Sequence, residues 1–316
     1  MTKDPDQRAR LRTGPLFLWA RYSPRVNART WKLAHGRELD LSQPRVVGIL
    51  NITPDSFADG GSYNTTEQAL ERARRCVKDG AAMLDIGGES TRPGAMRVST
   101  DDQIARVIPV IGAVRAALPD IAISVDTTRS EVARYAIEAG ADVINDVSGA
   151  EEDDAMLSIA AEMGAGLILM HRLAPPDKDS FSDRYESAPK YADVVASVRE
   201  YLSERIAAAQ RAGVDASSIA VDPGLGFGKS VEQNIELIRR TKELCTLGYP
   251  VMSAASRKSF VGRVGLDRDS DPSERLGASV AVTVLHAQEG ALLFRVHDVM
   301  EHVQALRAFA AVRTPG

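Results

Sequence analysis

Short runs of apolar, often β-branched residues recur along the chain from Arg45 onward. Each run is followed by a polar or glycine-rich stretch and then by a helical pattern. The apolar positions within a run are nearly continuous, which is typical of parallel strands covered on both faces. We therefore predict eight strands, at Arg45–Asn51, Ala81–Gly87, Ile121–Thr127, Ala141–Val147, Gly166–His171, Ile219–Gly224, Pro250–Ser256 and Leu292–Asp298.

Between these runs, apolar residues recur every three to four positions, as they do on amphipathic helices. Glycine follows several of these stretches directly before the next strand, which is a common signal for the end of a helix. The predicted helices span Thr66–Lys78 and residues 100–117, 130–139, 152–163, 190–212, 231–244, 273–288 and 299–311.

Eight strand–helix units over residues 45–312 fit one closed (β/α)8 TIM barrel, an α/β fold of about 250 residues. An open, doubly wound sheet is the alternative, because the order of the strands cannot be read from the sequence. Residues 30–42 alternate in polarity around His35-Gly36, which indicates a β-hairpin. We therefore divide the chain into an N-terminal extension with a hairpin (1–44), the barrel (45–312) and a short tail (313–316).

The chain has 316 residues, with 39 Lys and Arg against 43 Asp and Glu, so its formal net charge is −4. A chain of this charge has no general attraction to nucleic acid or to anionic lipid. No stretch approaches the roughly 20 apolar residues that a membrane helix needs. We expect small-molecule substrates rather than a nucleic acid or a membrane.

Cys76 and Cys245 lie far apart in the sequence and belong to no CxxC or Cys/His cluster. Neither a disulfide scaffold nor a structural zinc site is expected, and a reducing, cytoplasmic location is the expectation. The first 30 residues are rich in arginine, and their apolar run Phe17–Trp19 is too short for a signal-peptide core. We interpret them as a solvated extension.

Polar residues stand at the carboxyl ends of the predicted strands, where the active site of a barrel lies. Burying so many polar groups costs several kcal/mol unless a ligand or a metal pairs them, so a ligand site is favoured. The residues are Asn51, Asp85, Asp126, Asn145, His171, Asp222, Ser256-Arg257-Lys258 and Arg295-Val296-His297-Asp298.

These residues form two chemical sets. Asp126, Asn145, Asp222 and Lys258 suit a flat heterocycle with donor and acceptor edges, because a carboxylate accepts two parallel N–H bonds from a guanidine-like edge. The other set is Asn51, Arg295 and His297, with Arg92 and Arg257. It suits a phosphorylated substrate, since Arg binds phosphate in a bidentate manner.

Four loops bear on this site. Asn51–Tyr63 and Gly87–Ala95 are rich in Gly, Ser, Thr and Asp, so we expect both to fold over a bound ligand. Asp222–Lys229 matches neither GxGxxG nor GxxxxGK[ST], and its glycines are expected to let backbone and Phe227 approach a ligand. Arg172–Ser187 follows the fifth strand and is long.

The chain resembles the dihydropteroate synthase family over residues 45–312. Eight segments carry the resemblance in order, one at each strand end: GILNITPDSFADGG, DIGGESTRPGA, SVDT, INDVSG, LMH, DPGLGFGK, SRKSFVG and RVHD. The chain departs from the family in Arg172–Ser187, which is longer and lacks the usual glycine. Ala254-Ala255 also stand where a glycine-containing pair is common.

The resemblance implies that 6-hydroxymethyl-7,8-dihydropterin diphosphate is joined to 4-aminobenzoate in folate biosynthesis, with Mg²⁺ near Asn51, in a homodimer that sulfonamides inhibit. The implied pterin-binding residues are Asp126, Asn145, Asp222, Lys258, Arg295, Met170 and Asp85. Those for diphosphate are Asn51, Arg92, Arg295 and His297, and those for aminobenzoate are Thr91, Arg92, Pro93, Phe227, Lys258 and Ser259. Asp126, Lys258, Arg295 and His297 are the implied catalytic residues.

We expect a dissociative reaction, because no motif of an activated nucleophile is evident. Diphosphate would leave first and give a pterin-methyl cation, which Asp126 stabilises and the aromatic amine attacks. Arg295, His297 and Mg²⁺ would stabilise the departing charge. Two alternatives remain open: a pterin-binding paralogue without turnover, and a methyltetrahydrofolate-dependent corrinoid methyltransferase.

Overall fold

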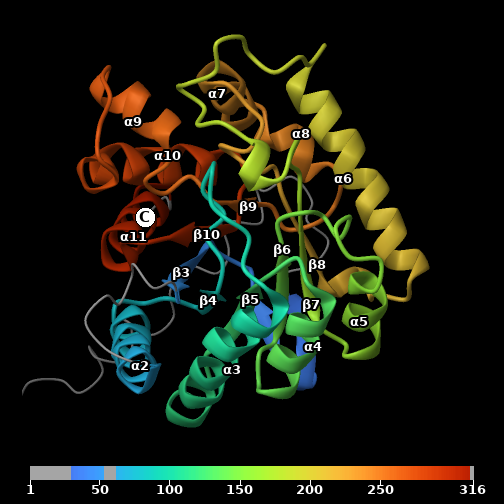
Figure 1. Cartoon of the computed structure of the whole chain (residues 1–316). Coiled ribbons are helices and arrows are strands. Elements are labelled where there is room, and N and C mark those ends of the chain that lie inside the picture. The colour runs from blue at the N-terminus through green and yellow to red at the C-terminus, as the bar shows by residue number, and fades with distance from the viewer. Residues whose placement is uncertain (1–29, 53–61, 314–316) are drawn as a thin grey trace, which may run out of the picture.

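The computed structural model describes residues 30–52 and 62–313. Strands occupy the centre and helices surround them (Figure 1). Eight parallel strands are hydrogen-bonded in the order β8-β7-β6-β5-β4-β3-β10-β9, and a bridge between Val221 and Val251 connects the two ends of this order. The (β/α)8 prediction is therefore confirmed, and the open sheet is excluded.

Of the eight strands, the first has the predicted bounds, and the other seven are shorter than predicted, mostly by one or two residues at an end. They are β3 Arg45–Asn51, β4 Met83–Gly87, β5 Ala122–Asp126, β6 Val143–Asp146, β7 Gly166–Met170, β8 Ile219–Asp222, β9 Met252–Ser253 and β10 Leu293–Val296. The helices are α2 Ser62–Lys78, α3 Thr100–Ala117, α4 Ser130–Glu138, α5 Met156–Glu162, α6 Val194–Arg211, α7 Val231–Arg239, α8 Thr241–Cys245, α9 Ser259–Leu266, α10 Leu276–Gln288 and α11 Val299–Arg313. None of the described helices is long and apolar enough to cross a membrane.

One predicted helix is divided in two, since α7 ends at Arg239 and α8 begins at Thr241. The Thr241 hydroxyl donates to the carbonyls of Leu237 at 2.9 Å and Ile238 at 3.0 Å. A threonine that bonds back to the preceding turn competes with the backbone ladder, which accounts for the break.

Two further differences concern a helix start and a helix that the sequence pattern did not predict. The helix predicted at 152–163 begins only at Met156, because Asp153 accepts from the backbone N–H of Ser130 and of Ala155 and so holds a turn before it. The short helix α9 was not predicted. It begins directly after Lys258 and so fixes the position of that residue.

A β-hairpin covers the amino-terminal end of the barrel. Strands β1 (Thr30–Lys32) and β2 (Glu38–Asp40) pair antiparallel around the predicted turn. Trp31 is buried, and its indole N–H donates to the Ser218 carbonyl at 2.8 Å. The hairpin packs on one apolar residue from each barrel strand: Val47, Met83, Ala122, Val143, Ile168, Ala220, Met252 and Leu293.

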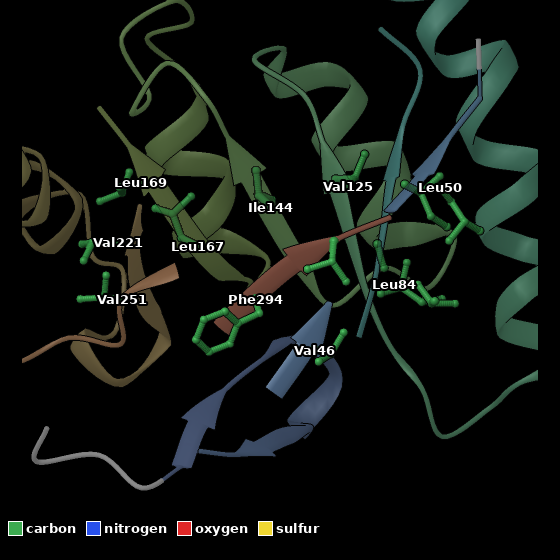
Figure 2. Close-up of a cluster of buried hydrophobic side chains, with 14 of the residues drawn as sticks. Val46, Leu50, Leu84, Val125, Ile144, Leu167, Leu169, Val221, Val251 and Phe294 are labelled. Atoms are coloured by element: carbon green, nitrogen blue, oxygen red, sulfur yellow. The ribbon is translucent and has the colours of Figure 1, made fainter. Parts of the chain in front are cut away.

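A second apolar layer lies between the strands and the surrounding helices. Figure 2 shows its strand residues, among them Val46, Leu84 and Phe294. These residues alternate along the strands with the interior layer beneath the hairpin, as the two-residue period of a strand requires. The alternation decides which polar residues face the barrel interior.

Candidate functional site

The two-residue period carries the predicted site residues onto the interior face of the barrel. Asp85 stands two residues beyond the interior Met83, and Asn145 stands two residues beyond Val143. Met170, Asp222 and Arg295 likewise stand two residues beyond interior residues, which are Ile168, Ala220 and Leu293. Asn51 lies four positions beyond the interior Val47, and Asp126 lies four positions beyond Ala122. These side chains therefore converge above the apolar layer, at the carboxyl end of the strands.

Arg295 is the centre of a buried charged cluster. Its Nε donates to Asp85 at 2.5 Å, and its Nη2 donates to Asp126 at 2.7 Å. The Ser124 hydroxyl donates to Asp85 at 2.5 Å, and the Asn145 amide lies 3.4 Å from both oxygens of Asp85. Residues from β4, β5, β6 and β10 are thus held in one network.

Two carboxylates share one guanidinium in this network, and the charges do not balance. Burial raises the pKa of Asp126 to about 7, because the attraction to Arg295 is partly offset by repulsion from Asp85. Although burial opposes its charge, Arg295 has a raised pKa because both carboxylates stabilise the guanidinium. Asp126 can therefore gain or lose a proton near neutral pH, whereas Arg295 stays charged.

Asn145 and Asp222 present hydrogen-bonding atoms that the described residues do not saturate. The Asn145 carbonyl oxygen is buried and has no partner among them. Such an atom is rare in a folded interior and points to a donor on a ligand. Asp222 accepts from the backbone N–H of Gly224 at 2.7 Å, which leaves further acceptor sites on the carboxylate. Burial raises the pKa of Asp222, against the opposing effect of Lys258.

Gly224 shapes the turn that holds Asp222. Its φ is +66°, and a Cβ there would lie 1.8 Å from the His171 carbonyl oxygen. Only glycine fits this conformation and this contact. At this position the glycine lets two backbone segments come together, and the expected approach of residues 222–229 to a ligand stays a prediction.

A cavity of about 520 Å³ opens above the charged cluster. It is lined by many of the predicted residues: Asn51, Thr91, Arg92, Pro93, Phe227, Lys258, Ser259, Arg295 and His297. The remaining predicted residues are buried, and they are Asp85, Asp126, Asn145, Met170 and Asp222. Arg295 connects the two groups, because it lines the cavity and also pairs with Asp85 and Asp126.

Lys258 and Phe227 form one side of the cavity. The Lys258 ammonium donates to the Leu225 carbonyl and lies 4.3 Å from the centroid of the Phe227 ring. Burial lowers the pKa of Lys258 to about 8, although Asp222 stabilises its charge. Met170 packs beneath Phe227, together with Val147. A cation above an aromatic ring suits an aromatic ligand with an anionic group.

The predicted anion-binding residues lie on the β3 and β10 side. Nδ1 of His297 is 3.2 Å from the Ser256 hydroxyl. Burial lowers the pKa of His297 to about 3, helped by the nearby Arg257 and Arg295 charges. His297 is therefore neutral at pH 7 and can offer a ring N–H but no positive charge. Arg257 is paired with Asp298, as Arg295 is with Asp85 and Asp126, so the positive charge of both guanidinium groups is partly compensated in the free site.

Only the second of the two expected ligand-covering loops can be followed. Residues 53–61 of the first loop lie outside the described residues. In the second loop, Thr91, Arg92 and Pro93 line the cavity. The N–H of Gly94 donates to the Pro176 carbonyl at 2.9 Å, so this loop contacts the segment that follows β7.

Sequence reasoning missed a buried contact between Lys229 and His171. The Lys229 ammonium lies 2.9 Å from Nδ1 of His171, and it donates to the carbonyls of Phe227 at 2.7 Å and Gly224 at 3.0 Å. Burial lowers the pKa of Lys229 to about 7. A lysine directly after a glycine-rich loop was the available signal, but its partners besides His171 are backbone carbonyls, which no side-chain pattern reveals.

Sequence reasoning also assigned no contact to Glu152, the first residue of the predicted helix 152–163, which lies outside α5. Its carboxylate accepts from Arg97, Arg172 and the Thr128 hydroxyl, the last at 2.7 Å. Arg97 follows β4, and Arg172 follows β7. Although burial opposes its charge, these hydrogen bonds lower the pKa of Glu152 to about 2. The ionised carboxylate therefore joins three loops at the carboxyl end of the barrel.

Comparison with known proteins agrees with this geometry. The sequence matches the family described as pterin binding enzyme over residues 47–297. The dihydropteroate synthase of Escherichia coli K12 is 43% identical over 278 residues, which cover 88% of this chain and 95% of that protein. The similarity thus extends over nearly the whole of both chains.

Solved structures show the same relationship. Xanthomonas albilineans dihydropteroate synthase with 4-aminobenzoic acid has a TM-score of 0.82 and 43% identity, covering 91% of this chain and all of that one. The same enzyme in complex with 7,8-dihydropteroate has a TM-score of 0.79 and 41% identity, with the same coverage. Family match, sequence identity and fold agree, and the chain belongs to the pterin-binding enzyme family, among the dihydropteroate synthases.

Proposed function

We propose that the protein joins 6-hydroxymethyl-7,8-dihydropterin diphosphate to 4-aminobenzoate and releases diphosphate. One observation carries this proposal: Arg295 connects a buried set of acid and amide groups to a cavity with basic and aromatic lining. A molecule with a heterocycle at one end and a diphosphate at the other matches such a site. The solved complexes of the Xanthomonas enzyme, with 4-aminobenzoic acid and with 7,8-dihydropteroate, support these substrates.

The buried residues would bind the pterin. Asp222 would accept the two N–H groups of its guanidine-like edge, since a carboxylate matches that geometry. The unpartnered oxygen of Asn145 would accept a third N–H. Asp85 and Met170 would complete the surroundings of the ring, and Lys258 would donate to its carbonyl oxygen.

The residues of the β3 and β10 side would bind the diphosphate. Arg295 supplies positive charge, the neutral His297 supplies a ring N–H, and Arg92 reaches the same cavity from the second loop. Asn51 lines the cavity beside them and offers an amide oxygen. Mg²⁺ typically keeps several waters and binds through few protein oxygens plus substrate phosphates.

The donor set therefore fits a Mg²⁺ ion held by Asn51 and the diphosphate. Bound there, the ion would neutralise phosphate charge. Within the described residues, no group of three or more His, Cys, Asp or Glu side chains could hold a metal by itself. We therefore expect metal binding to depend on the substrate.

A dissociative reaction agrees with the charges of the site. The bond between the pterin methylene carbon and the diphosphate oxygen breaks, and its electron pair leaves with the diphosphate. Arg295 stabilises this departing charge, while the carboxylate of Asp126 stabilises the positive pterin. The amine nitrogen then bonds to the methylene carbon and loses one proton. An aromatic amine is weakly basic, so this last step needs no strong base.

The outer part of the cavity would hold 4-aminobenzoate. Phe227 and Pro93 offer apolar contacts to its ring, and Lys258 lies above the Phe227 ring. Ser259 begins α9 and, with Thr91 and Arg92, offers donors for the carboxylate. The same contacts would bind a sulfonamide, which has the aniline ring of 4-aminobenzoate.

Assembly and location complete the proposal. We expect a homodimer, as the resemblance implies, which sedimentation of the purified protein would test. A cytoplasmic location suits Cys76 and Cys245, which are both buried free thiols.

The decisive experiment is an assay of the purified protein with pterin diphosphate and 4-aminobenzoate, with and without Mg²⁺. We expect 7,8-dihydropteroate and diphosphate in equal amounts, and loss of turnover when the metal is chelated. Tight pterin binding without any product would instead support the pterin-binding paralogue. A cobalamin-dependent methyl transfer would support the corrinoid methyltransferase, which has no need of a diphosphate site.

A further inference from the structure

The segment from Arg172 to Ser187, which follows β7, lies against the outer part of the substrate cavity. Loops after barrel strands usually need only about 2–6 residues. This one contains only a short 3-10 turn, at Pro176–Lys178. Several of its residues are nonetheless held by specific hydrogen bonds, so its path is defined.

Two hydrogen bonds attach the 172–187 segment to the loops that carry aminobenzoate residues. The Gly94 N–H donates to the Pro176 carbonyl at 2.9 Å, next to Arg92 and Pro93. The Gly228 N–H donates to the Asp179 carboxylate at 2.9 Å, next to Phe227. The Tyr185 hydroxyl donates to the other oxygen of Asp179 and holds that carboxylate in place.

Further contacts attach the segment to α7 and α9. The Asn234 amide of α7 donates to the buried Ser182 hydroxyl at 3.1 Å. Arg263 of α9 lies 3.9 Å from Asp183. Because Ser259 begins α9, the 172–187 segment contacts each of the three parts of the chain that supply the proposed aminobenzoate site.

The segment also contributes side chains to the cavity itself. Phe181, Asp183 and Arg184 line it together with Pro93 and Phe227. Phe181 is 39% exposed, so its ring is accessible to a ligand in the cavity. Asp183 has a side chain only 7% exposed, and its Oδ1 has no partner among the described residues.

We propose that the 172–187 segment forms a fourth wall of the aminobenzoate site, beside the second loop, the 222–229 loop and α9. In this wall, Phe181 contacts the aromatic ring of the amine substrate. Asp179 is a positioning residue, because it fixes the segment to the backbone beside Phe227. The segment therefore sets the affinity for the aromatic amine and leaves pterin binding to the buried cluster. This inference rests on the proposed function, since it names the amine as the ligand of this wall.

The test compares the KM values of the two substrates in Phe181→Ala. Loss of one aromatic contact is expected to raise the KM for 4-aminobenzoate about fivefold. The KM for pterin diphosphate stays within about twofold, whereas a general structural defect would change both. Phe181→Tyr keeps the ring and is expected to restore the wild-type KM. Lys178→Ala, an exposed position of the same segment, serves as the control and changes neither KM.

Asp179→Ala tests the positioning role. It removes the acceptor for Gly228 and is expected to raise the KM for 4-aminobenzoate in the same direction. Thermal unfolding and titration with 6-hydroxymethylpterin show whether each variant is folded and binds the pterin. Equal KM values for 4-aminobenzoate in wild type and folded Phe181→Ala would overturn the inference.

Failure of the proposed function gives a different result. In that case the wild type forms no dihydropteroate. Binding of 4-aminobenzoate is then measured by calorimetry, with 6-hydroxymethylpterin and diphosphate present. Weaker binding to Phe181→Ala than to wild type still supports the fourth wall, and equal binding overturns it.

Discussion

Arg295 and Asp126 form a buried ion pair, with Nη2 of the guanidinium 2.7 Å from Oδ2 of the carboxylate. The same guanidinium also pairs with Asp85 at 2.5 Å. Since two carboxylates face one permanent cation, one of them carries a negative charge that is poorly compensated in the free site. Such a site is prepared to stabilise a ligand that becomes positive during the reaction.

The first prediction concerns the pH dependence of stability. The pKa of Asp126 is raised from 3.8 to about 7 in the folded protein. Between these values the folded protein binds a proton that the unfolded chain has released, so this residue's contribution to stability is lost as the pH rises toward 7. Asp126→Asn is therefore expected to gain stability relative to wild type between pH 4.5 and 7.5.

Urea unfolding at several pH values measures this difference. Asp154→Asn removes an exposed carboxylate and is the control, whose stability difference from wild type stays constant. If the stability difference of Asp126→Asn also stays constant, Asp126 is already ionised at the low end of this pH range. In that case its pairing with Arg295 affects its pKa more strongly than burial does.

The second prediction separates charge from shape at Asp222. Asp222→Asn keeps an oxygen that accepts from Gly224, but it loses the carboxylate that would face the pterin. An unpaired donor at a buried site costs about 2 kcal/mol, or roughly 30-fold in affinity. Calorimetric titration with 6-hydroxymethylpterin is expected to show this loss. Unchanged pterin affinity would remove Asp222 from the pterin site.

Much of the fold and the site was predictable because both follow from a two-residue period. Apolar residues such as Met83 define the interior face, and the polar residue two positions on, here Asp85, must share it. Short-range periodicity also located the hairpin around His35-Gly36. The side chains that each strand contributes to the interior and to the site could therefore be assigned without knowledge of the three-dimensional structure.

Long-range pairing could not be predicted in this way. Glu152 binds Arg97 and Arg172, which are distant in sequence, and no local pattern specifies such partners. The state of His297 was also out of reach, because its pKa depends on burial and on Arg257 and Arg295. Similarly, the path of residues 172–187 depends on contacts with Gly94, Gly228 and Asn234, which lie far from this segment in the sequence.

The third prediction concerns the buried Lys229. Lys229→Met leaves the carbonyls of Gly224 and Phe227 and the His171 ring without their donor. The expected loss of stability is about 2 kcal/mol in urea unfolding. We also expect a higher KM for 4-aminobenzoate, since Phe227 lines that part of the cavity.

The control for Lys229 is Lys242→Met. Lys242 forms an exposed ion pair with Glu289 at 3.1 Å, and such pairs contribute little. The free energy of unfolding of Lys242→Met is expected to stay within about 0.5 kcal/mol of the wild-type value. If Lys229→Met and Lys242→Met show an equally small loss of unfolding free energy, the hydrogen bonds of Lys229 do not stabilise the 222–229 loop.

The fourth prediction concerns inhibition. A sulfonamide is expected to raise the KM for 4-aminobenzoate without lowering kcat, because both would contact Phe227 and Pro93 in the same cavity. Initial rates over a grid of inhibitor and substrate concentrations measure this. A mixed pattern, in which kcat also falls, would place the sulfonamide outside the amine site.

The last prediction separates the two ends of the barrel. Trp31 of the hairpin is buried against the interior apolar layer and donates to the Ser218 carbonyl. Trp31→Ala is expected to lower the free energy of unfolding by about 3–5 kcal/mol, because it leaves a large cavity. Trp31→Phe keeps most of the ring and is expected to lose about 1 kcal/mol with the hydrogen bond. In both variants the kcat of the folded fraction is expected to stay at the wild-type value, since the site lies at the opposite end of the strands. A fall in kcat without a fall in stability would mean that the hairpin acts on the site directly.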